Sequence, residues 1–96
     1  MKRGIFNRYV NFVCEGIGIS RDSLFSKNKE EKISSARFLL YSICHQRPMT
    51  IIQILDLMSE NGYDTNRNSI EYGLEKMSKE TDKDVLNFIK ECISYD

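Results

Sequence analysis

The sequence predicts an all-α fold of about six helices, and three observations support this. Apolar residues recur at the three- and four-residue spacing of helices along most of the 96-residue chain. No segment alternates polar and apolar residues over more than a few positions, as a half-buried strand would. The length suits one modest core, so we interpret residues 1–96 as a single domain.

The N-terminal part predicts one long and one short helix. The first is expected over about residues 4–15 and ends at Gly16 and Gly18, because glycine commonly follows a helix end. Its apolar face consists of Ile5, Tyr9, Phe12 and Val13. Ser20 is placed to cap a short second helix over residues 21–25.

The third helix is expected over about residues 31–46, after a polar loop over residues 26–31. Its apolar residues include Ile33, Ala36, Phe38, Leu39, Leu40, Tyr41, Ile43 and Cys44. Because apolar side chains surround this helix nearly completely, we expect it to be the central, buried one. Pro48 stops it, since the residue before a proline disfavours helix.

The C-terminal part predicts three helices. Thr50 is a good N-cap for the fourth, which closes at Asn61-Gly62, and Thr65 or Asn66 then caps the fifth. These two amphipathic helices form a helix–turn–helix unit over about residues 50–78, with a longer turn than is usual. A sixth helix follows over about residues 82–94, with Val85, Phe88, Ile89, Cys92 and Ile93 on one stripe.

The net charge is zero, from 14 Lys and Arg against 14 Asp and Glu, which counts against a nucleic-acid binder. The charges are unevenly distributed, however. Residues 1–50 hold nine basic and four acidic residues, a charge of +5, and residues 51–96 have a charge of −5. We therefore expect one basic face, supplied by the first half, with chance clustering on a solvated surface as the alternative.

Enzyme chemistry has little support in this sequence. Cys14, Cys44 and Cys92 are odd in number and far apart, so we expect small core residues in a reducing cytoplasm rather than disulfides or a zinc site. His45 points about 100° away from Cys44 on a helix, and no glycine-rich phosphate loop is present. We expect no catalysis, cofactor or metal, and no membrane helix, since no apolar run approaches about 20 residues.

The first turn of the fifth helix carries residue types that suit DNA. In a helix–turn–helix unit this turn meets base edges in the major groove. Arg pairs with guanine, Asn with adenine, and Ser or Thr reaches bases or phosphates. The residues concerned are Thr65, Asn66, Arg67, Asn68 and Ser69. Ordinary helix capping is the alternative for all of them except Arg67, because a cation is slightly unfavourable at a helix N-terminus.

A second basic site precedes and enters the third helix. It consists of Lys27, Lys29 and Arg37, of which Arg37 interrupts an apolar run. The alternative for Arg37 is a charge at the solvent margin of the buried helix.

Four segments resemble the C-terminal DNA-binding domain of the bacterial replication initiator DnaA, a Trp-repressor-like helix–turn–helix bundle. They are Leu24-Phe25-Ser26-Lys27 with Lys29, Ala36-Arg37 before Leu40-Tyr41, Thr50-Ile51-x-x-Ile54, and Asn66-Arg67-Asn68-Ser69-Ile70 with Lys76. The resemblance extends from about Ile5 to Cys92. It implies that Lys29 lies near phosphate or the minor groove, and that Arg37 and Thr50 touch the DNA backbone. Residues 66–69 would face the major groove.

The chain departs from that family in its turn and its signature. A Gly-Gly-Arg turn is replaced by residues 59–65, and Asn66 and Arg67 stand where the family has Asp and His. The preferred DNA sequence should therefore differ from that of the initiator. Glu30 and Glu31 in the basic loop should lower phosphate affinity. The nucleotide-binding domain of the initiator has no counterpart here.

These observations favour a cytoplasmic, non-enzymatic protein that binds double-stranded DNA in replication or transcription control and is encoded by a phage or mobile element. The alternative is a protein–protein interaction module, an adaptor or virion component, that kept the fold and lost DNA binding. The acidic second half, the lengthened turn and the acids in the basic loop favour that alternative.

Overall fold

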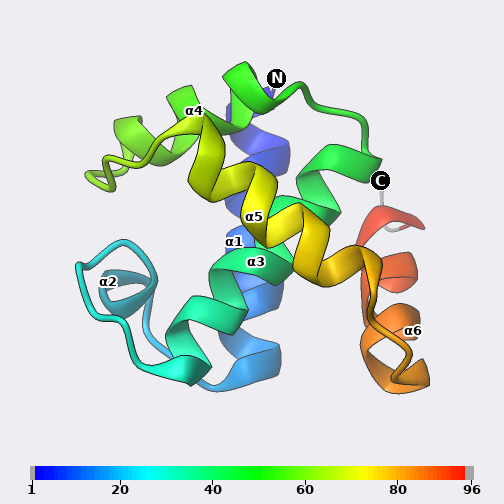
Figure 1. The fold of residues 1–96 in the computed structure, drawn as a ribbon. Helices are drawn as coiled ribbons and strands as arrows, with labels where there is room; N and C mark the ends of the chain where they lie inside the picture. The colour runs from blue at the N-terminus through cyan, green and yellow to red at the C-terminus, as the bar shows by residue number, and fades with distance from the viewer. Residues whose placement is uncertain (1, 95–96) are drawn as a thin grey trace.

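Residues 2–94, which the computed structural model describes, form six helices joined by short loops (Figure 1). They are α1 (Lys2–Ile17), α2 (Arg21–Leu24), α3 (Glu31–Gln46), α4 (Ile51–Glu60), α5 (Arg67–Ser78) and α6 (Lys83–Ser94). This described part contains no strand. The predicted all-α fold of about six helices is confirmed.

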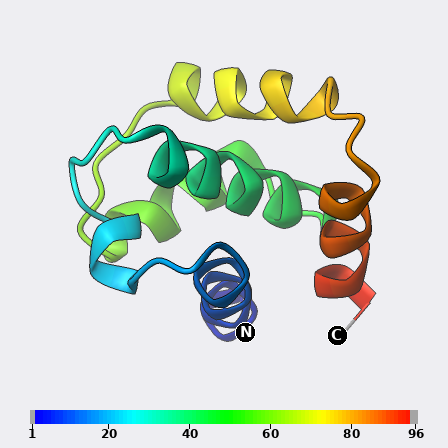
Figure 2. The same ribbon diagram turned by 90° about the horizontal axis from the view of Figure 1, so that it is seen from below.

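Helix α3 is the centre of the molecule, as its nearly continuous apolar surface predicts. Figure 2 shows α3 between α5 on one side and α1 on the other. Every other helix contacts α3. Leu40, Ile43 and Cys44 on this helix are fully buried.

One cluster of apolar side chains joins the helices. It takes Phe6, Tyr9, Val10 and Val13 from α1, Ile54 and Met58 from α4, Ile70 from α5, and Ile89 and Cys92 from α6. Burying a large apolar side chain stabilises a fold by about 1.5–3 kcal/mol. This shared core positions the surface residues discussed below.

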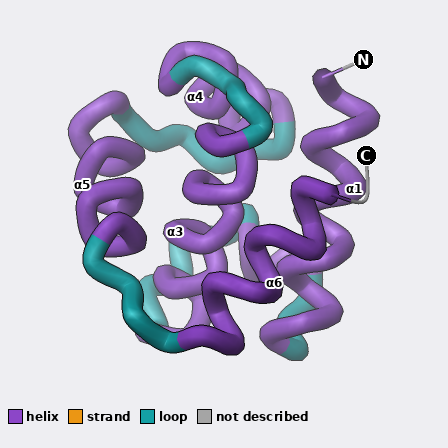
Figure 3. Tube along the Cα trace, turned by 90° about the vertical axis from the view of Figure 1, so that its right-hand side faces the viewer, coloured by secondary structure: helices purple, strands orange, loops and turns teal. Residues whose placement is uncertain are grey.

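The expected end of the first helix at Gly16 is wrong, because α1 continues to Ile17. Gly16 serves instead as a contact point for α6, which runs obliquely beside α1 (Figure 3). A Cβ atom at this position would lie 2.9 Å from Cε1 of Phe88. The chain turns at Gly18, whose φ of +83° lies in the left-handed region that glycine tolerates.

The helix starts in the second half confirm the capping residues read from the sequence. Thr50 caps α4 in a capping box, in which Thr50 Oγ1 accepts from the Gln53 amide and Gln53 Oε1 accepts from the Thr50 amide. Asn66, rather than Thr65, caps α5 by accepting a hydrogen bond from the Ser69 amide at 2.9 Å. Gly62, at a φ of +88°, makes the turn after α4.

The cysteines agree in part with their expected core positions. Cys44 and Cys92 are buried, whereas Cys14 is half-buried against the core. Burial raises the pKa of the Cys44 thiol to about 12, so this thiol is neutral at ordinary pH. Within residues 2–94 no helix combines the length and the apolar character needed to cross a membrane.

Candidate nucleic-acid interface

Helix α5 lies on the outside of the molecule and displays most of its side chains. Ile70 and Gly73 are its buried residues. Gly73 allows the α5 backbone to approach α3 closely, because a Cβ atom there would lie 2.6 Å from Cδ1 of Phe38 and 3.0 Å from Cδ2 of Tyr41. The rest of α5 is therefore held near α3 without being covered by it.

An open groove of about 560 Å³ runs between α5, α3 and the loop that joins α2 to α3. Its lining residues are Lys29, Ser34, Arg37, Phe38, Tyr41, Tyr63, Thr65, Asn66, Asn68, Ser69 and Tyr72. We call this feature the α3–α5 groove. It brings a basic loop and the first turn of a displayed helix to one surface, although some 35 residues separate them in the sequence.

The groove unites six of the nine residues that the sequence predicts for DNA binding. These six are Lys29, Arg37, Thr65, Asn66, Asn68 and Ser69. Lys27, Thr50 and Arg67 are exposed but do not line it. The first turn of α5 and the basic site before and within α3, which the sequence predicts separately, therefore lie along one groove, except for Lys27 and Arg67.

Two groove residues have structural tasks of their own. The side-chain oxygen Oδ1 of Asn66 caps α5 by accepting from the backbone amide of Ser69, which leaves the NH2 group of that side chain as a donor. The Thr65 side chain lies close to the Tyr41 side chain of α3, just before α5 begins. Burial is the main cause that raises the pKa of Tyr41 to about 12.

Arg67 begins α5 and faces solvent, with its side chain 63% exposed. Its Nε lies 3.3 Å from Oε1 of Glu71, one turn further along the helix. Exposed ion pairs of this spacing contribute only about 0.3–0.5 kcal/mol. A phosphate or a guanine edge can therefore replace Glu71 as the partner of Arg67 at little cost.

The alternative interpretation of Arg37, a charge at the solvent margin of the buried helix, is wrong, because Arg37 is only 3% exposed. Its Nε donates to the carbonyl oxygen of Leu24 at 2.8 Å, and its Nη2 donates to that of Ser26. Its guanidinium carbon lies 4.4 Å from the ring centre of Tyr63. These three partners satisfy the charge within the protein and explain how an arginine enters the core.

The groove has a positive electrostatic character at its wall. Lys29 is its exposed cation, the charge of Arg37 is met by partners within the protein, and none of its lining residues within the described segment is acidic. The N-terminus of α5 adds the partial positive charge of the helix dipole. Outside the groove, Glu71 and Glu75 of α5 are exposed and pair with Arg67 and Lys79.

Sequence reasoning missed the aromatic part of the groove. Tyr72 is 56% exposed and meets Phe38 edge-on, with ring centres 5.8 Å apart. The sequence does indicate that Tyr72 is exposed, since this residue lies beside the apolar stripe of α5 rather than on it. Tyr63 lies in the turn between α4 and α5, where no periodic pattern indicates which way a side chain points.

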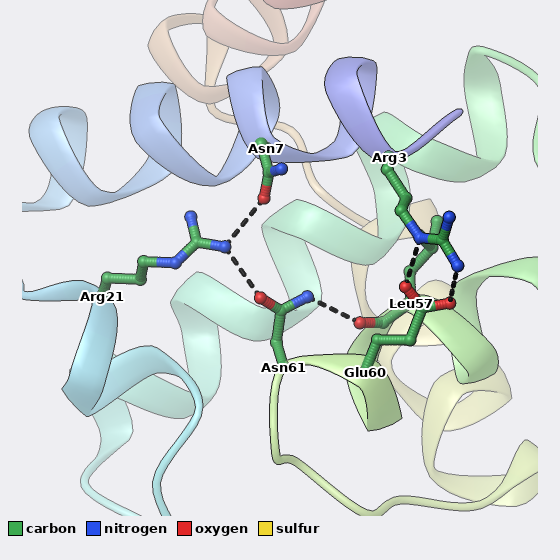
Figure 4. A network of polar contacts seen from close by, with 6 residues as sticks. All are labelled: Arg3, Asn7, Arg21, Leu57, Glu60 and Asn61. Carbon is green, nitrogen blue, oxygen red and sulfur yellow. Dashed lines mark hydrogen bonds and ion pairs between the residues drawn. The ribbon is translucent and has the colours of Figure 1, made fainter. Parts of the chain in front are cut away.

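A second polar surface joins α1, α2 and α4 (Figure 4). Arg21 Nη2 donates to Oδ1 of Asn7 at 2.7 Å and to Oδ1 of Asn61 at 2.8 Å. Arg3 forms two hydrogen bonds with the carboxylate of Glu60. We call these five residues the α1–α4 network. Its cations belong to the basic first half of the chain but have partners within the protein.

Within residues 2–94 no cluster of His, Cys, Asp and Glu is arranged to hold a metal ion. The α3–α5 groove is the largest of the surface hollows described. Comparison with protein-family models, curated proteins and solved structures finds no match to this chain.

Proposed function

We propose that this protein binds double-stranded DNA through the α3–α5 groove and the exposed start of α5. The observation that carries the proposal is the meeting of Lys29 with Asn66, Asn68 and Ser69 along one groove. A cationic loop supplies sequence-independent attraction to phosphate, and short polar side chains at a helix start suit base edges. Both kinds of contact are available from the same side of the molecule.

The display of α5 supports major-groove binding. A recognition helix must leave its first turn uncovered, and Arg67, Asn68 and Ser69 are all exposed. The resemblance of the sequence to the DNA-binding domain of DnaA points to the same helix. On this proposal the protein acts in the cytoplasm, in replication or transcription control for a phage or mobile element.

Charge limits the strength of the proposed interaction. The chain has no net charge, and Glu71 and Glu75 lie exposed on α5, the helix that would enter the major groove of DNA. Few phosphates can be neutralised under these conditions, and each one contributes separately to affinity. We therefore expect binding that is strong only at low salt and depends on a preferred base sequence.

Selection from a pool of random duplexes tests the proposal and identifies the preferred site. Arg67→Ala should then weaken binding to the selected duplex by about 1–3 kcal/mol, with a smaller effect on unselected DNA. Lys90→Ala is the matched control, because Lys90 is an exposed cation on α6, outside the groove. Absence of binding to any duplex at low salt would overturn the proposal.

A protein–protein interaction module is the second candidate, and the exposed surface of α5 favours it. Tyr72 offers a large, exposed aromatic side chain, and aromatic residues are enriched in protein-binding surfaces. A stable complex with a protein partner, abolished by Tyr72→Ala and by Arg67→Ala, would replace the DNA proposal. Affinity capture followed by size-exclusion chromatography makes this measurement.

A further inference from the structure

Arg37 is a charged residue in the core, and its bonds lead to two separate segments. On one side its guanidinium donates to the carbonyl oxygens of Leu24 and Ser26, in the chain that leads from α2 toward Lys29. On the other side it lies over the ring of Tyr63, in the turn before α5. One side chain on α3 thus contacts both edges of the α3–α5 groove.

The loop side of this contact continues to Lys29 through hydrogen bonds. Oγ of Ser26 accepts from the backbone amide of Asn28 at 3.2 Å, and the side-chain Oδ1 of Asn28 accepts from the backbone amide of Glu30 at 2.8 Å. Lys29 lies between these two bonded positions. A loop whose backbone is fixed on both sides of a lysine restricts where its amine can reach.

The α5 side of the contact is fixed in a similar way. The Tyr63 amide donates to the carbonyl oxygen of Met58 at 3.0 Å, so the turn is tied to the end of α4. Two residues later Thr65 lines the groove beside Tyr41, which lies one helical turn after Arg37 on α3. Asn66 and α5 follow directly.

We infer that Arg37 is a positioning residue, which sets the distance between Lys29 and the first turn of α5 without contacting DNA itself. The inference rests on the proposed function, since that distance determines whether both segments engage one duplex. Arginine suits this task because its planar fork donates in two directions while its face stacks on an aromatic ring. Lysine keeps the charge but lacks the fork.

Salt dependence of duplex binding separates positioning from direct contact. Each phosphate contact contributes about 0.9 to the slope of log affinity against log salt concentration. Lys29→Ala should lower that slope by about one contact. Arg37→Lys should lower it by a similar amount although the charge is unchanged, because the loop no longer holds Lys29 against phosphate. The salt slope of the double variant, Arg37→Lys with Lys29→Ala, should equal that of Arg37→Lys alone.

Two results would overturn the inference. If Arg37 contacts phosphate directly, lysine replaces it in that contact and the slope of Arg37→Lys remains that of the wild type. If Arg37 only stabilises the core, Arg37→Lys lowers the melting temperature but leaves the salt slope at the wild-type value. Adding Lys29→Ala to Arg37→Lys then lowers the salt slope by as much as it does in the wild type. Binding is measured well below the melting temperature of each variant, and Lys32→Ala serves as an exposed-cation control on α3.

A second variant covers the case in which Arg37→Lys fails to fold. Asn28→Ala changes an exposed side chain and removes the hydrogen bond to the Glu30 amide without altering any charge. It should lower the salt slope in the same direction as Arg37→Lys, and an unchanged slope would count against the inference. Wild-type protein that binds no duplex would instead overturn the proposed function itself.

Discussion

The α3–α5 groove and the α1–α4 network are both polar and both carry cations, but they use them differently. In the network, Arg21 donates to two asparagines and Arg3 to a carboxylate, so these charges join helices together. In the groove, Lys29 is exposed and lies beside the exposed side chains of Asn68 and Ser69. The polar groups of the α1–α4 network bond with one another within the fold, whereas several of those in the α3–α5 groove are exposed to solvent.

The difference shows that charge counted along the sequence does not equal charge available to a ligand. The first 50 residues have a charge of +5, yet Arg3, Arg21 and Arg37 of that half bond within the protein. A side chain held by internal partners loses those bonds when it turns to a ligand. The basic face expected from composition is therefore smaller than the count suggests.

The largest effect on this comparison is expected from Gly73→Ala, which changes the floor of the groove. The new Cβ would press on Phe38 and Tyr41, and overpacking of this kind costs about 1–3 kcal/mol. The better helix propensity of alanine offsets about 1 kcal/mol of this cost. The free energy of unfolding of Gly73→Ala should therefore fall by up to about 2 kcal/mol. Urea denaturation measures the difference.

Gly4→Ala is the matched control for Gly73→Ala. Gly4 also lies within a helix, but nothing is within 4 Å of its added Cβ. This variant should be stabilised slightly, by at most about 1 kcal/mol. Equal stabilisation of both variants would show that α5 does not press on α3 at Gly73.

The next largest effect separates the cations of the two surfaces. Arg21→Ala should lower the free energy of unfolding by about 1 kcal/mol, because Asn7 and Asn61 lose a shared donor, while DNA affinity stays unchanged. Lys29→Ala should have the opposite pattern, with unchanged unfolding and weaker DNA binding. Chemical denaturation and fluorescence anisotropy on the same two variants make the test. Similar effects on binding would mean that both surfaces meet DNA.

A smaller effect is expected at alkaline pH from Tyr41 under the groove. Its pKa rises from 10.0 to about 12 on folding, mainly through burial. Its stabilising contribution is therefore complete below pH 10 and is lost as the pH rises from about 10 toward 12, because ionisation then favours the unfolded chain. Tyr41→Phe should lose less stability over this range, measured by urea denaturation. Tyr72→Phe, an exposed tyrosine, should behave as the wild type.

The smallest effect is expected from Glu60 in the network. The hydrogen bond from Arg3 is the main cause that lowers the pKa of Glu60 from its ordinary 4.5. The stabilising contribution of Glu60 is thus present above pH 4.5 and disappears as the pH falls through its lowered value. Glu60→Gln should flatten the acid end of the stability profile slightly, and 1 M salt should reduce the difference, because both groups are exposed. A profile identical to that of the wild type would mean that this ion pair does not persist in solution.

The sequence predicts the helices better than it predicts the site. Caps such as Thr50 and apolar spacing on α3 act over a few residues, so they can be read locally, and both are confirmed. Gly16 misleads because its role depends on Phe88, which is 72 residues away. The burial of Arg37 likewise depends on carbonyl groups of a preceding loop and on Tyr63 in a later turn. Such contacts leave no periodic signal in the sequence.

The shallow burial of α5 also has a consequence for local unfolding. Ile70 and Gly73 are its buried residues, whereas much of α3 is enclosed on all sides. Helices with few buried contacts open at a lower free energy than the rest of a fold. Amide hydrogens of α5 should therefore exchange with solvent well before those of α3, as a unit and without global unfolding. A helix that displays its side chains in this way can also adjust to the shape of a ligand.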